Sequence, residues 1–226
     1  MSTHPLRRLA QITGDYLRIA PMEDKAERCL ALMFAENLAQ ISKESLAEQG
    51  PDDLAVRALR YAPQLLWRKD ICSHRLLYDA ACSAFNHVHW TEFYKEDDWS
   101  RSFLSEFANG EGIGPDGRLW HDEVILGLFV LGPHTVYPPH AHPAEEFYVV
   151  LSGAPEWQVG AGKGYETVNN GEVVMHRSEV SHSIRTKGSP LFAVYGWRGD
   201  INARSWYRDD MTDPEGEVKH PVIQKS

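Results

Sequence analysis

The chain has 226 residues, 42% of them hydrophobic, which is long enough for one sizeable domain or for one domain with a helical extension. Its formal net charge is -9 and no run of basic residues occurs, so we do not expect binding to nucleic acids or to an anionic membrane. No apolar stretch has the length of a signal peptide or a membrane span, which predicts a cytoplasmic protein.

Helical periodicity dominates the N-terminal part of the chain. Residues 5–20 carry apolar side chains at a rough helical spacing. After a turn, Asp24 can accept hydrogen bonds from the first N–H groups of a helix that has Glu27 at its third position. The apolar pattern predicts that this second helix ends near Gly50.

Two further helical segments follow. Residues 52–69 begin with Asp52 and Asp53 as capping candidates and contain Pro63, which predicts a break or a kink. Residues 73–88 place apolar side chains on one side of a helix. We expect these helices to pack on one another or on a sheet. A second copy of the chain could cover part of the same surface, which would make the protein a homodimer.

The cysteines Cys29, Cys72 and Cys82 all lie in helical segments. They lack the Cys-x-x-Cys spacing of redox and zinc motifs, and their number is odd. We therefore expect buried free thiols rather than disulfides or zinc ligands.

Residues 90–120 combine aromatic side chains with acidic residues and glycines. The stretch contains NGEGIGPDGR, which is rich in turn-forming residues. Its glycines do not form a phosphate-binding loop, because no Gly-Lys-Ser/Thr follows and no strand is predicted before them. The pattern predicts a linker or a lid rather than a regular element.

Short strands are predicted after this stretch. Segments rich in Val, Ile and aromatic residues alternate with Gly, Pro and Asn turns, which is typical of an antiparallel sandwich or a small barrel. We therefore divide the chain into a helical N-terminal region with an aromatic-rich linker (1–118), a β-barrel (119–210) and a polar C-terminal tail (211–226). The expected strands are 124–131, 145–151, 155–160, 172–176, 182–186 and 190–197.

Four potential metal ligands lie in the barrel region. His140 and His142 are separated by one residue, so both imidazoles leave the same face of an extended segment. Glu146 and Tyr148 form a second pair on one face, and His182 lies in a later strand-turn-strand segment. Three imidazoles and a carboxylate suit a divalent transition metal such as Zn, Mn or Fe.

Other residues could line the same cavity. His121, His134 and His176 are candidates, although an ordinary surface or supporting role fits each of them as well. The aromatic residues of the barrel region are expected in the core, with one or two facing the pocket. They are Trp120, Phe129, Trp157, Tyr195 and Trp197.

The spacing of these residues resembles the two motifs of the cupin superfamily. The first motif is matched by Gly132, His140, His142, Glu146 and Gly153. Seven residues separate its glycine from its first histidine, which is longer than usual. Residues 171–185 resemble the second motif, with His182 in the histidine position, Glu172 in place of the common aspartate, and no proline in the turn. This resemblance implies a single C-terminal double-stranded β-helix, or jelly-roll barrel.

A narrower resemblance is to the cupin-type dimethylsulfoniopropionate lyases. It rests on Tyr148 two residues after Glu146, on Tyr137 three residues before His140, and on a helical extension before a single barrel. It implies metal-dependent cleavage of a small zwitterionic sulfonium to dimethyl sulfide and acrylate. Tyr148, or alternatively Tyr137, would remove the α-proton in a β-elimination, since a nearby divalent cation favours a phenolate.

The same set of ligands serves other metal cupins, because fold and metal do not determine the reaction. An iron dioxygenase or a sugar isomerase, acting on a small organic acid or a sugar, is therefore the alternative enzyme. A non-catalytic cupin that binds a small molecule is a third reading. Such a sensor protein would normally carry an output module, for example a DNA-binding domain. The N-terminal helices lack the basic recognition segment of a helix-turn-helix domain, which argues against this reading.

Overall fold

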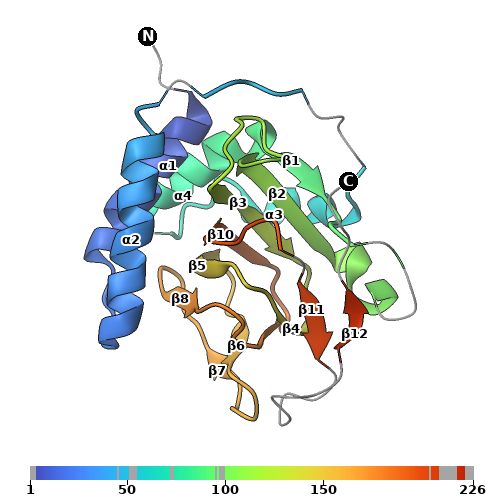
Figure 1. Cartoon of the computed structure of the whole chain (residues 1–226). Helices are drawn as coiled ribbons and strands as arrows, with labels where there is room; N and C mark the ends of the chain where they lie inside the picture. Colours follow the sequence, from blue (N-terminus) through green and yellow to red (C-terminus); the bar gives the residue numbers. More distant parts are fainter. Residues whose placement is uncertain are drawn as a thin grey trace.

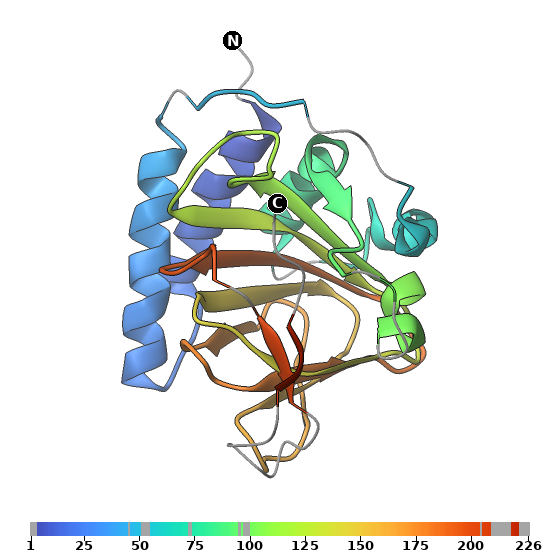
Figure 2. The same ribbon diagram turned by 45° about the vertical axis from the view of Figure 1, so that its right-hand side comes forward.

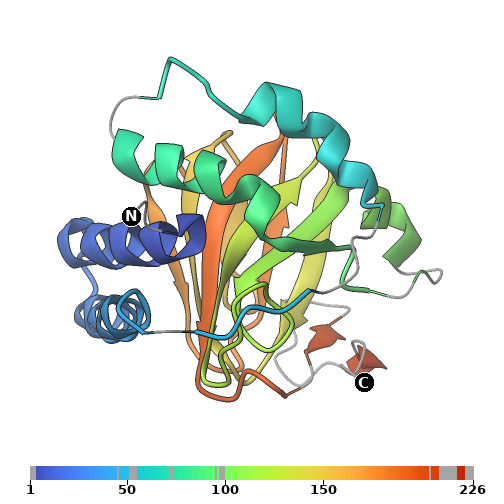
Figure 3. The same cartoon turned by 90° about the horizontal axis from the view of Figure 1, so that it is seen from above.

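The computed structural model describes residues 4–44, 46–50, 55–71, 74–94, 96, 100–203, 205–208 and 218–221. Within these residues, two six-stranded sheets face each other, and helices cover the outer face of one of them (Figure 1). Viewed from above, the helices gather along one side of the strands (Figure 3). This is the predicted helical extension joined to a jelly-roll barrel.

Helices α1 (Pro5–Ile19) and α2 (Lys25–Ile41) lie side by side against the sheet (Figures 1 and 2). The predicted cap is confirmed, because the Asp24 carboxylate accepts from the N–H groups of Ala26 and Glu27 at 2.8 and 2.9 Å. Phe34 of α2 packs edge to face on Phe147, with ring centroids 4.9 Å apart. The apolar faces of both helices therefore form one core with the outer face of the sheet.

The second helical region is shorter than predicted. The predicted break near Pro63 is present, because the chain forms the 3-10 helix η1 (Arg57–Tyr61) followed by a single turn, α3 (Ala62–Leu65). Pro63 is the second residue of α3, where its missing N–H has no intrahelical partner to lose. Helix α4 (Arg75–Ala84) and η2 (Phe85–His87) follow as expected. Asp52 and Asp53 lie outside the described residues.

The strands form two antiparallel sheets. The first has the order β1-β2-β3-β10-β5-β8, and its strands are β1 (His89–Thr91), β2 (Phe107–Ile113), β3 (Val124–Leu131), β10 (Leu191–Arg198), β5 (Glu145–Ser152) and β8 (Val173–His176). The second has the order β12-β11-β4-β9-β6-β7, and its strands are β12 (Val218–Pro221), β11 (Trp206–Arg208), β4 (Val136–Ala141), β9 (His182–Arg185), β6 (Glu156–Val159) and β7 (Glu166–Thr167).

Strand β5 shows how side chains alternate between the two faces of the first sheet. Phe147 and Val149 point to the helices, whereas Tyr148 and Val150 belong to the second core, between the sheets. That second core is rich in aromatic residues and surrounds the candidate site. An apolar, largely aromatic core therefore lies between the two sheets.

The prediction of a linker over residues 90–120 is wrong. This segment contains the end of β1, the 3-10 helices η3 (Ser100–Ser102) and η4 (Leu104–Glu106), and β2, which pairs with β3 along most of its length. The glycines of β2 are packing residues, because a Cβ at Gly110 would lie 2.6 Å from the side chain of Val88. The first sheet therefore begins before residue 119.

The predicted C-terminal tail, residues 211–226, includes a strand. Strand β12 pairs with β11, and β11 in turn pairs with β4. Residues 211–217 and 222–226 lie outside the described residues. The stretch that was expected only as a polar tail therefore contributes an edge strand to the second sheet.

The cysteine prediction is confirmed in part. Both described cysteines are free, but only Cys82 is buried, whereas Cys29 is exposed on α2. Cys72 lies outside the described residues. Across the residues that the structure describes, no helix combines the length and hydropathy needed to cross a membrane. The homodimer stays a prediction.

The centre of β3 offers a test of how tightly the sheet is packed. At Gly127, a Cβ would collide with the carbonyl oxygen of Gly110 and lie 2.5 Å from the ring of Tyr195. We expect Gly127→Ala to lower the free energy of unfolding by about 1–3 kcal/mol, because overpacking forces the backbone to shift. Denaturant unfolding measures this. The matched control is Gly188→Ala, since no atom lies within 4 Å of the added Cβ there; equal stabilities of the two variants would contradict the packing.

Candidate metal centre

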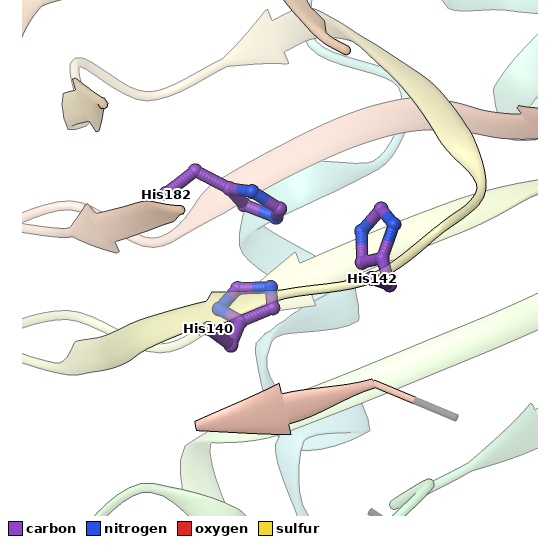
Figure 4. Close-up of side chains that lie close together, drawn as sticks. All are labelled: His140, His142 and His182. Atoms are coloured by element: carbon purple, nitrogen blue, oxygen red, sulfur yellow. The ribbon is translucent and has the colours of Figure 1, made fainter. Parts of the chain in front are cut away.

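Three histidines from two hydrogen-bonded strands meet in the barrel interior (Figure 4). His140 lies on β4 directly opposite His182 on β9, and His142 immediately follows β4. The ring centroid of His182 is 4.1 Å from that of His140 and 5.0 Å from that of His142. All three side chains are no more than 2% exposed. The convergence expected from the sequence is therefore present.

Backbone carbonyl groups orient all three imidazoles in the same way. The Nδ1 atoms of His140, His142 and His182 lie 2.8 Å from the carbonyl oxygens of Pro138, Ala144 and Val180, respectively. A carbonyl oxygen only accepts, so each Nδ1 carries the proton and each Nε2 presents a lone pair. This is the arrangement by which proteins orient histidine ligands of metals.

Glu146 completes the cluster from β5. Its Oε2 lies 3.3 Å from Nε2 of His142 and 3.3 Å from Nε2 of His182. Burial alone would raise the pKa of this carboxyl, but the histidines around it, with Nδ1 of His176 at 2.7 Å from Oε2, hold its pKa well below the usual range. Glu146 is therefore a carboxylate at neutral pH although its side chain is only 2% exposed.

Burial has the opposite effect on the imidazoles of His140 and His182, because it favours their neutral form. Burial lowers the pKa of His140 well below its ordinary value, and the neighbouring histidines lower it further. Burial also lowers the pKa of His182, although Glu146 opposes this effect. A metal site needs neutral imidazole and ionised carboxylate, and these protonation states meet that requirement.

The donor atoms fit a cation. Because Nδ1 carries the proton, Nε2 of His142 and Nε2 of His182 each direct a lone pair at Oε2 of Glu146. This carboxylate oxygen can only accept hydrogen bonds. Nε2 of His182 is also buried without a hydrogen-bond partner. Such opposed lone pairs are unfavourable unless a positive charge lies among them. In each of two overlapping sets, one containing His140, His142 and His182, the other Glu146, His176 and His182, the potential ligand atoms lie within 4.8 Å of one another. Nitrogen and oxygen donors of this kind suit a divalent transition metal.

The two tyrosines predicted as bases both lie in the interior beside this cluster. Tyr148 is 3% exposed and shares the inner face of β5 with Glu146. Tyr137 is 5% exposed, its ring centroid is 4.1 Å from that of His140, and its hydroxyl group hydrogen-bonds to that of Tyr94. Burial and then the charge of Glu146 raise the pKa of Tyr148 well above its ordinary value.

The remaining candidates separate clearly. His176 belongs to the cluster, since its Nδ1 lies 2.7 Å from Oε2 of Glu146. His134 is exposed, and His121 accepts hydrogen bonds from the backbone at the start of β3. The sequence analysis grouped His176 with His121 and His134, because the pairing of β5 with β8 is not evident from the sequence.

Among the aromatic residues, Trp157 and Trp197 contact the cluster, whereas Trp120 is 45% exposed.

Comparisons with known proteins identify the family of the chain. A family model described as dimethylsulfoniopropionate lyase matches residues 68–193. The chain is 29% identical over 175 residues to dimethylsulfoniopropionate lyase DddQ of Ruegeria pomeroyi, covering 74% of this chain and 85% of that protein. The crystal structure of DddQ from the same organism aligns with a TM-score of 0.63 at 26% identity, over 82% of this chain and 96% of the other.

A second solved structure supports the fold alone. It comes from a study of the dimethylsulfoniopropionate lyases RdDddP and RnDddQII, and it aligns with a TM-score of 0.66 at 18% identity. The alignment covers 91% of this chain and 98% of the other. A fold with this helical extension therefore exists in solved structures.

The cluster predicts which residues the metal content depends on. We expect His182→Ala to weaken the binding of a divalent metal by at least about 100-fold, because loss of a ligand costs more than loss of an outer partner. Metal analysis of the purified protein measures this. His87→Ala, at an exposed histidine of η2, is the control and should keep the metal. Full metal content in His182→Ala would exclude His182 as a ligand.

Proposed function

The chain belongs to the cupin-type dimethylsulfoniopropionate lyase family, and from this premise we propose that it cleaves dimethylsulfoniopropionate to dimethyl sulfide and acrylate. It is a carbon-sulfur lyase by family. The observation that carries the proposal is the cluster of three Nε2 lone pairs and the Glu146 carboxylate, with two buried tyrosines beside it.

The proposed metal ligands are His140, His142, Glu146 and His182. Their tautomers and charges are set before any cation arrives, because backbone carbonyls hold the imidazoles and hydrogen bonds hold the carboxylate. When bound, a divalent cation such as Zn, Mn or Fe would act as a Lewis acid on the substrate carboxylate and favour the phenolate form of a neighbouring tyrosine.

Tyr148 is the proposed base. As a phenolate, its Oη would take the proton from the carbon next to the substrate carboxylate. The electron pair of that C–H bond would form the carbon-carbon double bond of acrylate, and the pair of the C–S bond would leave with sulfur as neutral dimethyl sulfide. The proton remains on Tyr148 Oη until solvent removes it. Neutral dimethyl sulfide leaves readily, so the reaction needs no strong general acid.

Tyr137 is the alternative base, and its surroundings differ from those of Tyr148. Its hydroxyl group already has a hydrogen-bond partner in Tyr94, and its ring lies against His140. These contacts suit a residue that orients its neighbours. Tyr148, in contrast, shares a strand face with Glu146 and lies among Phe129, Trp157 and Tyr195.

Aromatic faces in the interior suit the sulfonium end of the substrate. Trp197 packs on His142 with ring centroids 4.3 Å apart, and the ring centroid of Phe93 lies 6.5 Å from that of Trp197. A cation over such a ring gains about 0.5–2 kcal/mol. Since the proposed ligands and both tyrosines are no more than 5% exposed, bulk water is excluded from the reacting groups.

The first test of this function is turnover of the proposed substrate. We expect purified protein incubated with dimethylsulfoniopropionate to release dimethyl sulfide into the headspace and to leave acrylate in solution. A chelator should abolish the release, and added divalent metal should restore it, because the proposed ligands act through a cation. Gas chromatography of the headspace measures the product. No volatile sulfur product from metal-loaded protein would overturn the proposal.

The second test assigns the base. We expect Tyr148→Phe to keep the metal and to lower kcat by about 100- to 10,000-fold, the usual effect of losing a general base. Tyr195→Phe is the matched control, because Tyr195 packs on Tyr148 while its hydroxyl group donates to Asn109. Normal release of dimethyl sulfide by Tyr148→Phe would remove Tyr148 from the mechanism, and a comparable loss in Tyr137→Phe alone would move the role to Tyr137.

A further inference from the structure

A row of three inward-facing side chains crosses three neighbouring strands of the first sheet. Glu146 on β5 is the register partner of His176 on β8 and also of Trp197 on β10. Side chains at paired positions of neighbouring strands lie on the same face of the sheet. The carboxylate is therefore flanked on both sides by residues that carry N–H groups.

Both neighbours donate to the carboxylate, one to each oxygen. The indole N–H of Trp197 donates to Oε1, and Nδ1 of His176 lies 2.7 Å from Oε2. Two donors on opposite sides fix the plane of a carboxylate, whereas one donor would leave it free to turn. The remaining lone pair of Oε2 then faces Nε2 of His142 and His182.

A tryptophan on the opposite sheet determines which nitrogen of His176 carries the proton. Trp157 Nε1 lies 2.9 Å from Nε2 of His176, and an indole N–H can only donate. Nε2 of His176 is therefore an acceptor, and its Nδ1 must carry the proton that Glu146 accepts. With both ring nitrogens engaged, His176 has no free lone pair for a cation, although it lies among the potential ligands.

The same two donors also pack on the imidazoles of the proposed ligands. His176 stacks on His182 with ring centroids 3.7 Å apart and an interplanar angle of 22°. Trp197 lies on His142 with centroids 4.3 Å apart and an angle of 33°. Each donor thus touches two proposed ligands, the carboxylate through its N–H group and an imidazole through its ring face.

From this geometry we propose that His176 is a positioning residue of the metal centre, acting as the middle member of a Trp157–His176–Glu146 hydrogen-bond relay. The inference rests on the proposed function, because it assumes that Glu146 and His182 hold a cation. The relay orients the Glu146 carboxylate and the His182 ring before the cation binds. Its role is distinct from ligation, since His176 offers no lone pair.

Metal affinity tests the relay without reference to turnover. The probe is Co²⁺ added to the metal-free protein, with the dissociation constant and the visible absorption spectrum as readouts. We expect His176→Phe, which keeps a stacking ring but loses the N–H group, to raise the dissociation constant by about 10- to 100-fold and to alter the spectrum. His176→Asn places an amide N–H near the position of Nδ1 and should recover most of the affinity.

A buried histidine elsewhere in the fold is the matched control. His74 is 4% exposed at the start of α4, and its Nε2 contacts the carbonyl oxygen of Leu151 at 2.8 Å. His74→Phe should change the stability of the protein but leave Co²⁺ affinity unchanged. Wild-type affinity in His176→Phe would overturn the relay, and so would equal losses in His176→Phe and His176→Asn, because the N–H group would then be irrelevant.

The outer link of the relay keeps the inference testable if His176→Phe does not fold. Trp157→Phe removes the donor to Nε2 and frees His176 to take the other tautomer, so the Co²⁺ dissociation constant should rise. An unchanged constant in this variant would overturn the relay. Failure of the wild-type protein to bind Co²⁺, Zn²⁺ or Mn²⁺ would instead overturn the metal site itself, which separates the two proposals.

Discussion

The buried carboxylate of Glu146 is the constraint on which the rest of the structure depends. An ionised carboxylate inside an apolar barrel costs several kcal/mol unless hydrogen bonds and opposite charge compensate it. Trp197 and His176 supply the hydrogen bonds from the strands on either side of β5. The opposite sheet supplies the imidazoles of His140 and His182. The neighbouring strands of one sheet therefore orient the carboxylate, and the opposite sheet supplies the imidazoles that face it.

Much of the fold follows from patterns that act locally. The cap at Asp24, helices α2 and α4, and strands β3, β5, β6, β8, β9 and β10 were predicted because periodicity and turn residues are readable within a short window. Strands β4 and β7 were not among the expected strands. Strand β2 was missed because its glycines read as turn residues, whereas in the fold Gly110 leaves room for Val88 and Trp90. That requirement comes from a distant part of the chain, and no local pattern contains it.

The residues of the candidate site also fall into those that local sequence patterns predict and those that depend on distant contacts. His140, His142 and Glu146 lie close together in the sequence, so their spacing alone placed them near one another. The supporting residues could not be assigned in this way, because His176 and Trp197 reach Glu146 across 30 and 51 residues of sequence. Their contacts depend on which strands are neighbours and in which register they pair, and the tautomers of the histidines depend in turn on those contacts.

The packing of Phe34 on Phe147 has a consequence for the evolution and engineering of this fold. Phe147 stands next to Glu146 on β5 and points to the opposite side of the sheet, so the helical layer supports the back of the strand that carries the carboxylate. Helices and barrel should accordingly melt as one cooperative unit. A shortened chain without α1 and α2 would bare a broad apolar sheet face to solvent and would tend to aggregate, so the helical extension is not a detachable module.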